Sequence, residues 1–405
     1  MNCKLLLFLC LSMCLAVDNA MASHVDEAKA REIASRFIRS SRLKTNMSFE
    51  GKMTEVAKSA SYNEFYIFCG SGNQGFVIVS ADDCVQPILG YSEESLFDVD
   101  NIPDVVRWWL DRYEEEIKQC RTTCQPDERI TRQWEQLLTD TESKDPTVVP
   151  VVGPLITTRW GQDGTGSPTY NKFCPQTNTG IHALTGCVAT AGAQIMKYWN
   201  HPHSGRGSET YVVDGNPYTG SPDFGGVTLT ADFANTIYDW DNMPEALYPA
   251  TSPVEEIDAV ATLIYHVGVA VHMIYGVNVS NAYLSSGYYS TGASLEAAFR
   301  NHFKYSNTVC SVEESQFDHA EWVALLKSEL NAERPMAYAG GDHAFVCDGY
   351  DSEDLFHFNW GWKGLYNGYY AIGSLNPGSH SYNIGCKAII GIQPQEAEVP
   401  EKSQV

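Results

Sequence analysis

The segment Gly186-Cys187-Val188-Ala189-Thr190 opens an apolar run that continues to Trp199. The run is typical of a buried helix, and it places the Cys187 thiol at the N-terminus of that helix. Unsatisfied backbone N–H groups in the first turn and the positive end of the helix dipole favour a thiolate, which makes the sulfur a nucleophile near neutral pH. A free cysteine is more often a small buried apolar residue, so a catalytic role for Cys187 requires partners elsewhere in the chain.

A second segment offers a base and a partner that orients it. In Gly340-Gly341-Asp342-His343, a glycine-rich turn leads into a strand and places His343 at the rim of a sheet. The next apolar run, 355–358, leads into Asn359-Trp360-Gly361-Trp362. In a hairpin of these two strands, we expect the Asn359 amide oxygen to accept a hydrogen bond from one ring nitrogen of His343 and to turn the other toward the thiol. We expect Trp360 to cover that hydrogen bond and exclude water.

These motifs together resemble the streptopain family of papain-like bacterial cysteine peptidases. The resemblance rests on residues 186–191, 193–198, 343–346 and 359–362, and it extends over most of the chain. It implies a cysteine endopeptidase made as an inactive zymogen, with Cys187 as nucleophile and His343 as base. It also implies a papain-like α+β catalytic domain with two subdomains, preceded by a small α+β inhibitory prodomain.

The order of the expected elements supports a two-part catalytic domain. Helical patterns at 254–275, 294–303 and 319–332 follow the Cys187 helix. After Pro335 the pattern changes to short apolar strands, expected at 336–339, 343–347, 355–358, 369–372 and 387–392. A helical half that carries the thiol would then face a sheet half that carries the imidazole, with the active site in the cleft between them.

The tetrahedral oxyanion also needs hydrogen-bond donors. Gln162, in Trp160-Gly161-Gln162-Asp163, lies upstream of Cys187 as the oxyanion glutamine does in papain-like enzymes. An ordinary surface glutamine is the alternative, because the interval to Cys187 differs from that of papain itself. His182 is a weaker candidate base than His343, because a loop histidine so close to Cys187 would need a sharp reversal of the chain. Trp360, Trp362 and Asp342 are the expected supporting residues.

The first part of the chain indicates export and latency. Residues 1–22 combine an early Lys4 with an apolar stretch and a small-residue end, which is typical of a secretory signal peptide. Cys14 only partly fits a lipoprotein signal. Residues 23–147, with a helix at 25–38, strands at 65–69 and 76–80 and a long amphipathic pattern at 105–120, resemble the family's inhibitory propeptide.

The remaining boundaries follow from composition. Residues 139–154 have the polar, proline-containing composition of an exposed linker, where proteolytic cutting is expected. The catalytic domain is then expected at 148–394, and 395–405 form a polar tail that we expect to be disordered. We place the protein outside the bacterial cytoplasm, as a secreted, periplasmic or cell-surface chain without a stable membrane span.

Charge and cysteine count narrow the function further. The 405 residues carry a formal net charge of −23, which argues against nucleic-acid binding. Five of the 12 cysteines lie in the expected catalytic domain, and this odd number agrees with one unpaired reactive thiol. Cys120 and Cys124 have a spacing that metal pairs use, but no second pair accompanies them, so helix packing is favoured. We expect no cofactor.

Three functions remain open on the sequence alone. A secreted cysteine endopeptidase with protein or peptide substrates, inhibited by its own propeptide, is favoured. A papain-like acyltransferase or amidase would keep the same Cys-His-Asn order. A non-enzymatic inhibitor or adhesin would need neither the thiol nor the imidazole, so the presence of Cys187, His343 and Asn359 argues against it.

Overall fold

The computed structural model describes residues 23–40, 62–70, 75–123, 128–139, 148–163, 167–214, 223–286, 292–375 and 385–395. The expected signal peptide with Cys14, the linker residues 140–147 and the tail beyond residue 395 lie outside the described residues. None of the helices in these ranges combines the length and the apolar character that crossing a membrane requires.

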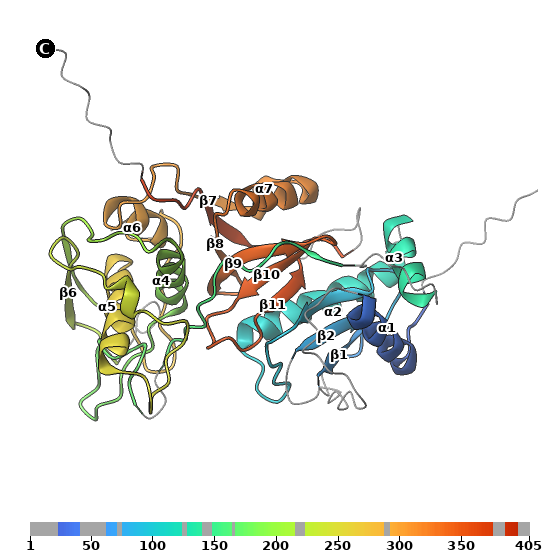
Figure 1. Cartoon of the computed structure of the whole chain (residues 1–405), viewed down its shortest axis with the longest axis horizontal. Helices are drawn as coiled ribbons and strands as arrows, with labels where there is room; N and C mark the ends of the chain where they lie inside the picture. Colours follow the sequence, from blue (N-terminus) through green and yellow to red (C-terminus); the bar gives the residue numbers. More distant parts are fainter. Residues whose placement is uncertain are drawn as a thin grey trace, which may run out of the picture.

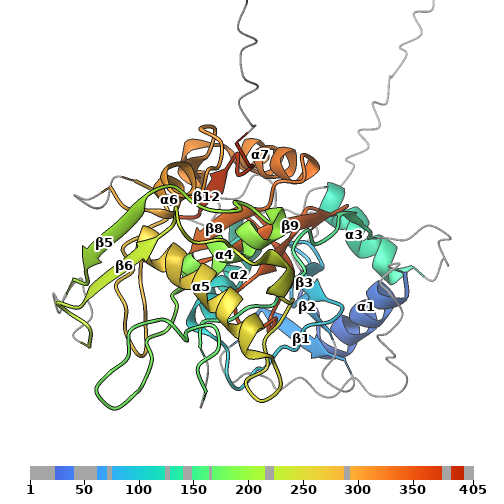
Figure 2. The same cartoon turned by 60° about the vertical axis from the view of Figure 1, so that its left-hand side comes forward.

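The chain forms three parts that lie side by side, with a β-sheet in the middle (Figure 1). The helical half, drawn in green and yellow, packs against one side of the orange and red strands, and the blue N-terminal part lies on the other side (Figures 1 and 2). The main sheet is antiparallel and runs in the order β1-β2-β3-β11-β10-β9-β8-β12-β7. This mixture of helices with an antiparallel sheet confirms the expected α+β class.

The helical half contains the thiol helix. Its elements are α4 (Cys187–Trp199), the hairpin β5 (Ser208–Val212) and β6 (Thr228–Asp232), the 3₁₀ turn η1 (Trp240–Asn242), α5 (Val254–Ala270) and α6 (Leu295–Asn301). Helix α4 is buried from Cys187 through Met196. Gly192 permits this close packing, because a Cβ there would lie 2.7 Å from a Leu295 methyl group on α6.

The sheet half contains the imidazole strand. Its elements are β7 (Cys310–Glu313), η2 (Glu314–Gln316), α7 (His319–Asn331), β8 (Met336–Gly340), β9 (His343–Asp351), β10 (Leu355–Asn359), β11 (Gly368–Ala371) and β12 (Lys387–Ile390). Side chains alternate along β9: Ala344 and Val346 join the core of the helical half, whereas Phe345 and Cys347 join the other core. One strand therefore connects the two layers of the molecule.

The N-terminal part continues the same sheet. It comprises α1 (Glu27–Ser40), β1 (Phe65–Cys69), β2 (Phe76–Ser80), β3 (Ile88–Ser92), α2 (Asp104–Thr123) and α3 (Glu128–Leu138). Strand β3 pairs with β11 through Tyr91 opposite Tyr369 and Gly90 opposite Tyr370. Because β11 belongs to the sheet half, the N-terminal part docks by adding its strands to that sheet, and the two share one hydrophobic core.

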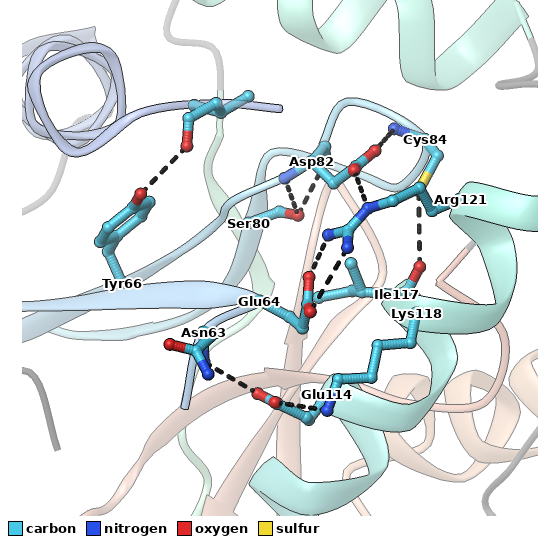
Figure 3. Close-up of polar contacts among 11 residues, drawn as sticks. Asn63, Glu64, Tyr66, Ser80, Asp82, Cys84, Glu114, Ile117, Lys118 and Arg121 are labelled. Carbon is cyan, nitrogen blue, oxygen red and sulfur yellow. Dashed lines mark hydrogen bonds and ion pairs between the residues drawn. The ribbon is translucent and has the colours of Figure 1, made fainter. Parts of the chain in front are cut away.

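A charged cluster ties the N-terminal part together internally. Arg121, near the end of α2, binds the Glu64 carboxylate and donates from Nε to Asp82 Oδ2 at 2.6 Å (Figure 3). The Asp82 side chain is almost fully buried, and its Oδ1 accepts the Cys84 backbone N–H at 3.0 Å. A buried carboxylate requires such a partner, so the end of α2 is fixed to the strands beside it.

The end of the expected linker is more ordered than its composition indicated. Residues Pro150–Val152 form strand β4, which pairs with the far end of β9 at Asp351 and Tyr350. Two of these three residues are nevertheless exposed, because β4 contacts the sheet by backbone hydrogen bonds rather than by burying its side chains. Residues 150–152 of the expected linker are therefore mostly exposed, as predicted, but they are paired to the sheet.

Candidate active site

Cys187 begins α4, as the sequence predicted. Gly186 precedes it with φ +85°, a conformation that side-chain-bearing residues rarely adopt, and a Cβ there would collide with the Met273 side chain at 2.5 Å. The Thr190 hydroxyl, in the first turn, donates to the Gly186 carbonyl at 3.0 Å. The glycine thus allows the chain to turn sharply into the helix and leaves the thiol at its first residue, with only 9% of the Cys187 surface exposed.

His343 begins β9, immediately after a left-handed turn. Gly341 and Asp342 have φ of +56° and +60°. The turn returns the chain from β8, so that His343 pairs with Gly340 at the rim of the sheet. The Asp342 side chain is exposed, so we assign its supporting role to the conformation of this turn.

The thiol and the imidazole contact each other across the junction of the two halves. Burial alone would raise the pKa of Cys187. This effect is outweighed by the imidazolium charge, by a hydrogen bond with the His343 ring and by the backbone N–H groups of Ala344 and Val188. The pKa of Cys187 therefore lies below its usual value. Burial alone would lower the pKa of His343, but the thiolate charge, the same hydrogen bond and the Trp360 carbonyl raise it. Both shifts favour a thiolate–imidazolium pair.

The second ring nitrogen of His343 does not form its hydrogen bond with Asn359. Nε2 instead lies 3.0 Å from the Trp360 backbone carbonyl, to which a protonated nitrogen donates. A register shift in the β9–β10 ladder places Asn359 opposite Val346, three residues beyond His343. Asn359 Nδ2 donates to the Thr158 carbonyl at 2.7 Å, and its Oδ1 accepts the Gly361 N–H at 3.2 Å. The expected hydrogen bond between Asn359 and His343 was therefore wrong.

Trp362, and not Trp360 as expected, covers the imidazole. Trp362 stacks on the His343 ring, with centroids 5.4 Å apart and planes 11° from parallel. The Trp360 indole is fully buried against Phe345, with ring centroids 4.4 Å apart, and its Nε1 donates to the Tyr366 carbonyl at 3.1 Å. Trp362 therefore covers the imidazole, and Trp360 orients it through its backbone oxygen.

Gln162 is buried beside the segment that precedes Cys187. It is 6% exposed, and its backbone carbonyl accepts the N–H of Thr185, two residues before Cys187, at 3.0 Å. The surface-glutamine alternative is therefore wrong. The backbone of Gln162 thus contacts the segment that leads into α4, and its role as an oxyanion donor stays a prediction.

The other candidates take no part in this constellation. His182 Nδ1 lies 3.2 Å from the Cys174 carbonyl. Among the described residues, no group of histidines, cysteines and carboxylates has the arrangement of a metal site. None of the described cysteines forms a disulfide, so the absence of a disulfide does not by itself distinguish Cys187. Cys124 lies outside the described residues, and Cys120 is buried in α2.

The N-terminal part packs on the elements that hold His343, a contact that the sequence did not indicate. The indole of Trp108, on α2, fills the space beside Gly341, where a Cβ would approach it to 2.6 Å. The next residue, Trp109, meets Phe345, Phe358 and Trp360 edge-on at centroid distances of 5.2 to 6.3 Å. Helix α2 thus supports the β8–β9 turn and the strand that follows it.

Known proteins resemble both parts of the chain. The profile of the Peptidase C10 family matches residues 160–370, and that of the Spi protease inhibitor matches residues 22–117. Streptopain of Streptococcus pyogenes is 33% identical over 342 residues, which cover 79% of this chain and 78% of streptopain. The thiol protease/hemagglutinin PrtT of Porphyromonas gingivalis is 32% identical over 417 residues, covering 98% of this chain and 44% of PrtT. The chain thus spans less than half the length of PrtT.

A solved structure agrees with the fold. Prevotella intermedia prointerpain A superposes with a TM-score of 0.62 at 32% identity, covering 81% of this chain and 95% of that one. The papain-like catalytic domain and the inhibitor-like prodomain expected from the sequence are therefore confirmed. The chain belongs to the peptidase C10 family of cysteine peptidases.

Proposed function

We propose that this protein is the zymogen of a cysteine endopeptidase in which Cys187 is the nucleophile and His343 the general acid and base. The observation that carries the proposal is the contact between the Cys187 thiol and the His343 ring, with each group favouring the charged form of the other. An endopeptidase also needs a proton donor for the leaving amine, and the imidazolium supplies it.

The reaction follows from these positions. The Cys187 thiolate attacks the carbonyl carbon of the scissile peptide bond, and the negative charge moves to the carbonyl oxygen. The Cys187 backbone N–H and the Gln162 side-chain amide donate hydrogen bonds to this oxyanion. His343 gives its proton to the departing amine, which leaves an acyl-enzyme. The neutral imidazole then removes a proton from water, whose oxygen attacks the acyl carbon; the carboxylic acid product leaves, and the Cys187 thiolate and the His343 imidazolium are restored.

Residues 23–147 act as the inhibitory prodomain. The packing of Trp108 and Trp109 on the β8–β9 turn and its neighbours supports this role, because the same elements hold His343. Activation then requires cutting in the 139–154 linker. The apolar N-terminal 22 residues support export from a bacterial cell, and proteins or peptides are the substrate class.

A casein digestion with and without the irreversible thiol inhibitor E-64 tests the function. We expect the activated wild type to digest casein, E-64 to abolish digestion, and Cys187→Ala to be inactive and to accumulate uncut. Ala suits a helix start, so the variant should melt at nearly the wild-type temperature. Digestion that survives E-64, or a correctly processed Ala variant, would contradict the proposal.

A further inference from the structure

We infer that Gln194 is a positioning residue for the reaction, which sets the imidazole against the thiol by holding Asn359 and the Trp360 carbonyl in place. The inference rests on the proposed roles of Cys187 and His343. It begins with the place of Gln194 on α4, seven residues after Cys187. Seven residues are about 20° short of two full helical turns, so the two side chains project from the same face of the helix.

Gln194 is the centre of a buried polar cluster between the two halves of the enzyme. Its side chain is fully buried. Oε1 accepts from the Thr158 hydroxyl at 3.0 Å, the Trp160 N–H at 3.2 Å and Asn359 Nδ2 at 3.2 Å. Nε2 donates to Asn359 Oδ1 at 3.4 Å. One amide therefore joins the thiol helix to the segment that leads to Gln162 and to the end of β10.

The path from Gln194 to the imidazole has one further step. Asn359 Oδ1, held by Gln194, also accepts the Gly361 N–H, so that its side chain spans Trp360. This short loop fixes the peptide whose carbonyl oxygen binds His343 Nε2. Asn359 thus acts on the imidazole through the backbone of Trp360, and Gln194 fixes Asn359 relative to α4.

A buried glutamine in a well-packed interface invites a purely structural explanation, in which its loss lowers stability alone. The arrangement indicates a role in positioning the reacting groups as well, because all four hydrogen bonds lead to segments that carry these groups and none leads to the surrounding apolar core. Loss of this amide should leave substrate binding intact and misplace the imidazole. The effect should therefore fall on kcat, since a shift of about 1 Å at a reacting group costs on the order of 100-fold.

Gln194→Met tests the inference, because methionine keeps the volume and removes all four hydrogen bonds. The full chain of each variant is activated in the same way, and its working thiols are titrated with E-64, so that kcat refers to intact sites. We expect kcat on a peptide substrate to fall about 10- to 100-fold with KM changed less than about threefold. Gln194→Glu keeps an oxygen that accepts three of the four bonds, and it should recover a large part of the loss.

A control and a second variant make the outcome decisive. Tyr238→Phe removes another buried hydrogen bond of the same half, to His266 at 3.1 Å, and should lower the melting temperature without changing kcat. A wild-type kcat in Gln194→Met, or an equal loss in Tyr238→Phe, would overturn the inference. If Gln194→Met does not fold, Gln194→Glu tests the inference in its place. We then expect kcat to fall about 3- to 10-fold, and an unchanged kcat would overturn the inference. A wild type without a titratable thiol would instead contradict the proposed function.

Discussion

Replacing Trp109 with alanine should release the prodomain from the catalytic domain. Trp109 is 1% exposed and meets the rings of Phe345, Phe358 and Trp360 on the catalytic side. Its Nε1 donates to the Tyr113 hydroxyl at 3.0 Å. That hydroxyl lies 2.9 Å from the carbonyls of Leu89 in the prodomain and Ala371 in β11, so it bridges the two parts.

The size of the effect follows from this burial. Truncating a fully buried tryptophan to alanine costs about 3–5 kcal/mol. If most of that loss falls on the docked state, the population of undocked protein rises roughly 100- to 1,000-fold, since each 1.4 kcal/mol is about tenfold in an equilibrium constant. Full-length Trp109→Ala should therefore expose its active site far more often than the wild type.

The assay is the rate at which E-64 labels Cys187 in the uncut chain, followed as the labelled full-length band on a gel. We expect Trp109→Ala to label at least 100-fold faster than the wild type, up to the rate of the mature enzyme. Trp134→Ala is the matched control, because this tryptophan is 5% exposed but donates within the prodomain, to the Val85 carbonyl at 2.8 Å. A wild-type labelling rate in Trp109→Ala, or equal acceleration in both variants, would refute the docking role.

Two further variants test the polar groups of the sheet. Asn359→Ala should lower kcat about 10- to 100-fold, as Gln194→Met does, because it frees the Trp360 peptide that binds His343. It should also lower the free energy of unfolding by about 1–3 kcal/mol, because it leaves the Thr158 carbonyl unpaired. A full loss of activity would mean that Asn359 acts directly on His343. In the wild type, burial raises the pKa of Asp351 from 3.8 to about 7. Between these pH values the folded zymogen binds a proton that the unfolded chain has lost, so the wild type loses stability as pH rises. Asp351→Asn removes this titrating group. The melting temperature of Asp351→Asn relative to wild type should therefore rise from pH 4 to pH 7 and level off above it, and a constant difference would contradict the assignment.

The local signals of the sequence were sufficient for most elements. Helix α4 begins at Cys187 and ends at Trp199, and strands β1 and β2 have the expected bounds, because continuous apolar runs flanked by polar residues or glycine mark them. Helix α3 was missed, although Ile130, Trp134 and Leu137 have the i, i+4, i+7 spacing of an amphipathic helix. Strand β3 contains Gly90, which reads as a turn; a Cβ there would lie 2.8 Å from the Tyr369 carbonyl of the neighbouring strand.

The parts of the site that depend on tertiary register could not be predicted. The hairpin of β9 and β10 was expected, but the register that pairs Asn359 with Val346, and so leaves the Trp360 carbonyl as the partner of His343, depends on how the two strands meet. Gln194 gave one usable signal, as a polar residue in an apolar helical run on the face that carries Cys187. The contacts of Trp108 and Trp109 with residues more than 200 positions away had no local signal.

The central claim is that Cys187 and His343 form a thiolate–imidazolium pair, and the pH dependence of Cys187 alkylation tests it most directly. Wild type and His343→Ala are cut in the linker by the same added protease and treated with iodoacetamide across a pH range, and the adduct on Cys187 is quantified by mass spectrometry. Since the imidazolium lowers the pKa of Cys187, the wild type should already alkylate rapidly at pH values below the ordinary thiol range. His343→Ala should react only as pH rises toward the ordinary thiol range. The same pH profile in both proteins would contradict the ion pair and the mechanism built on it.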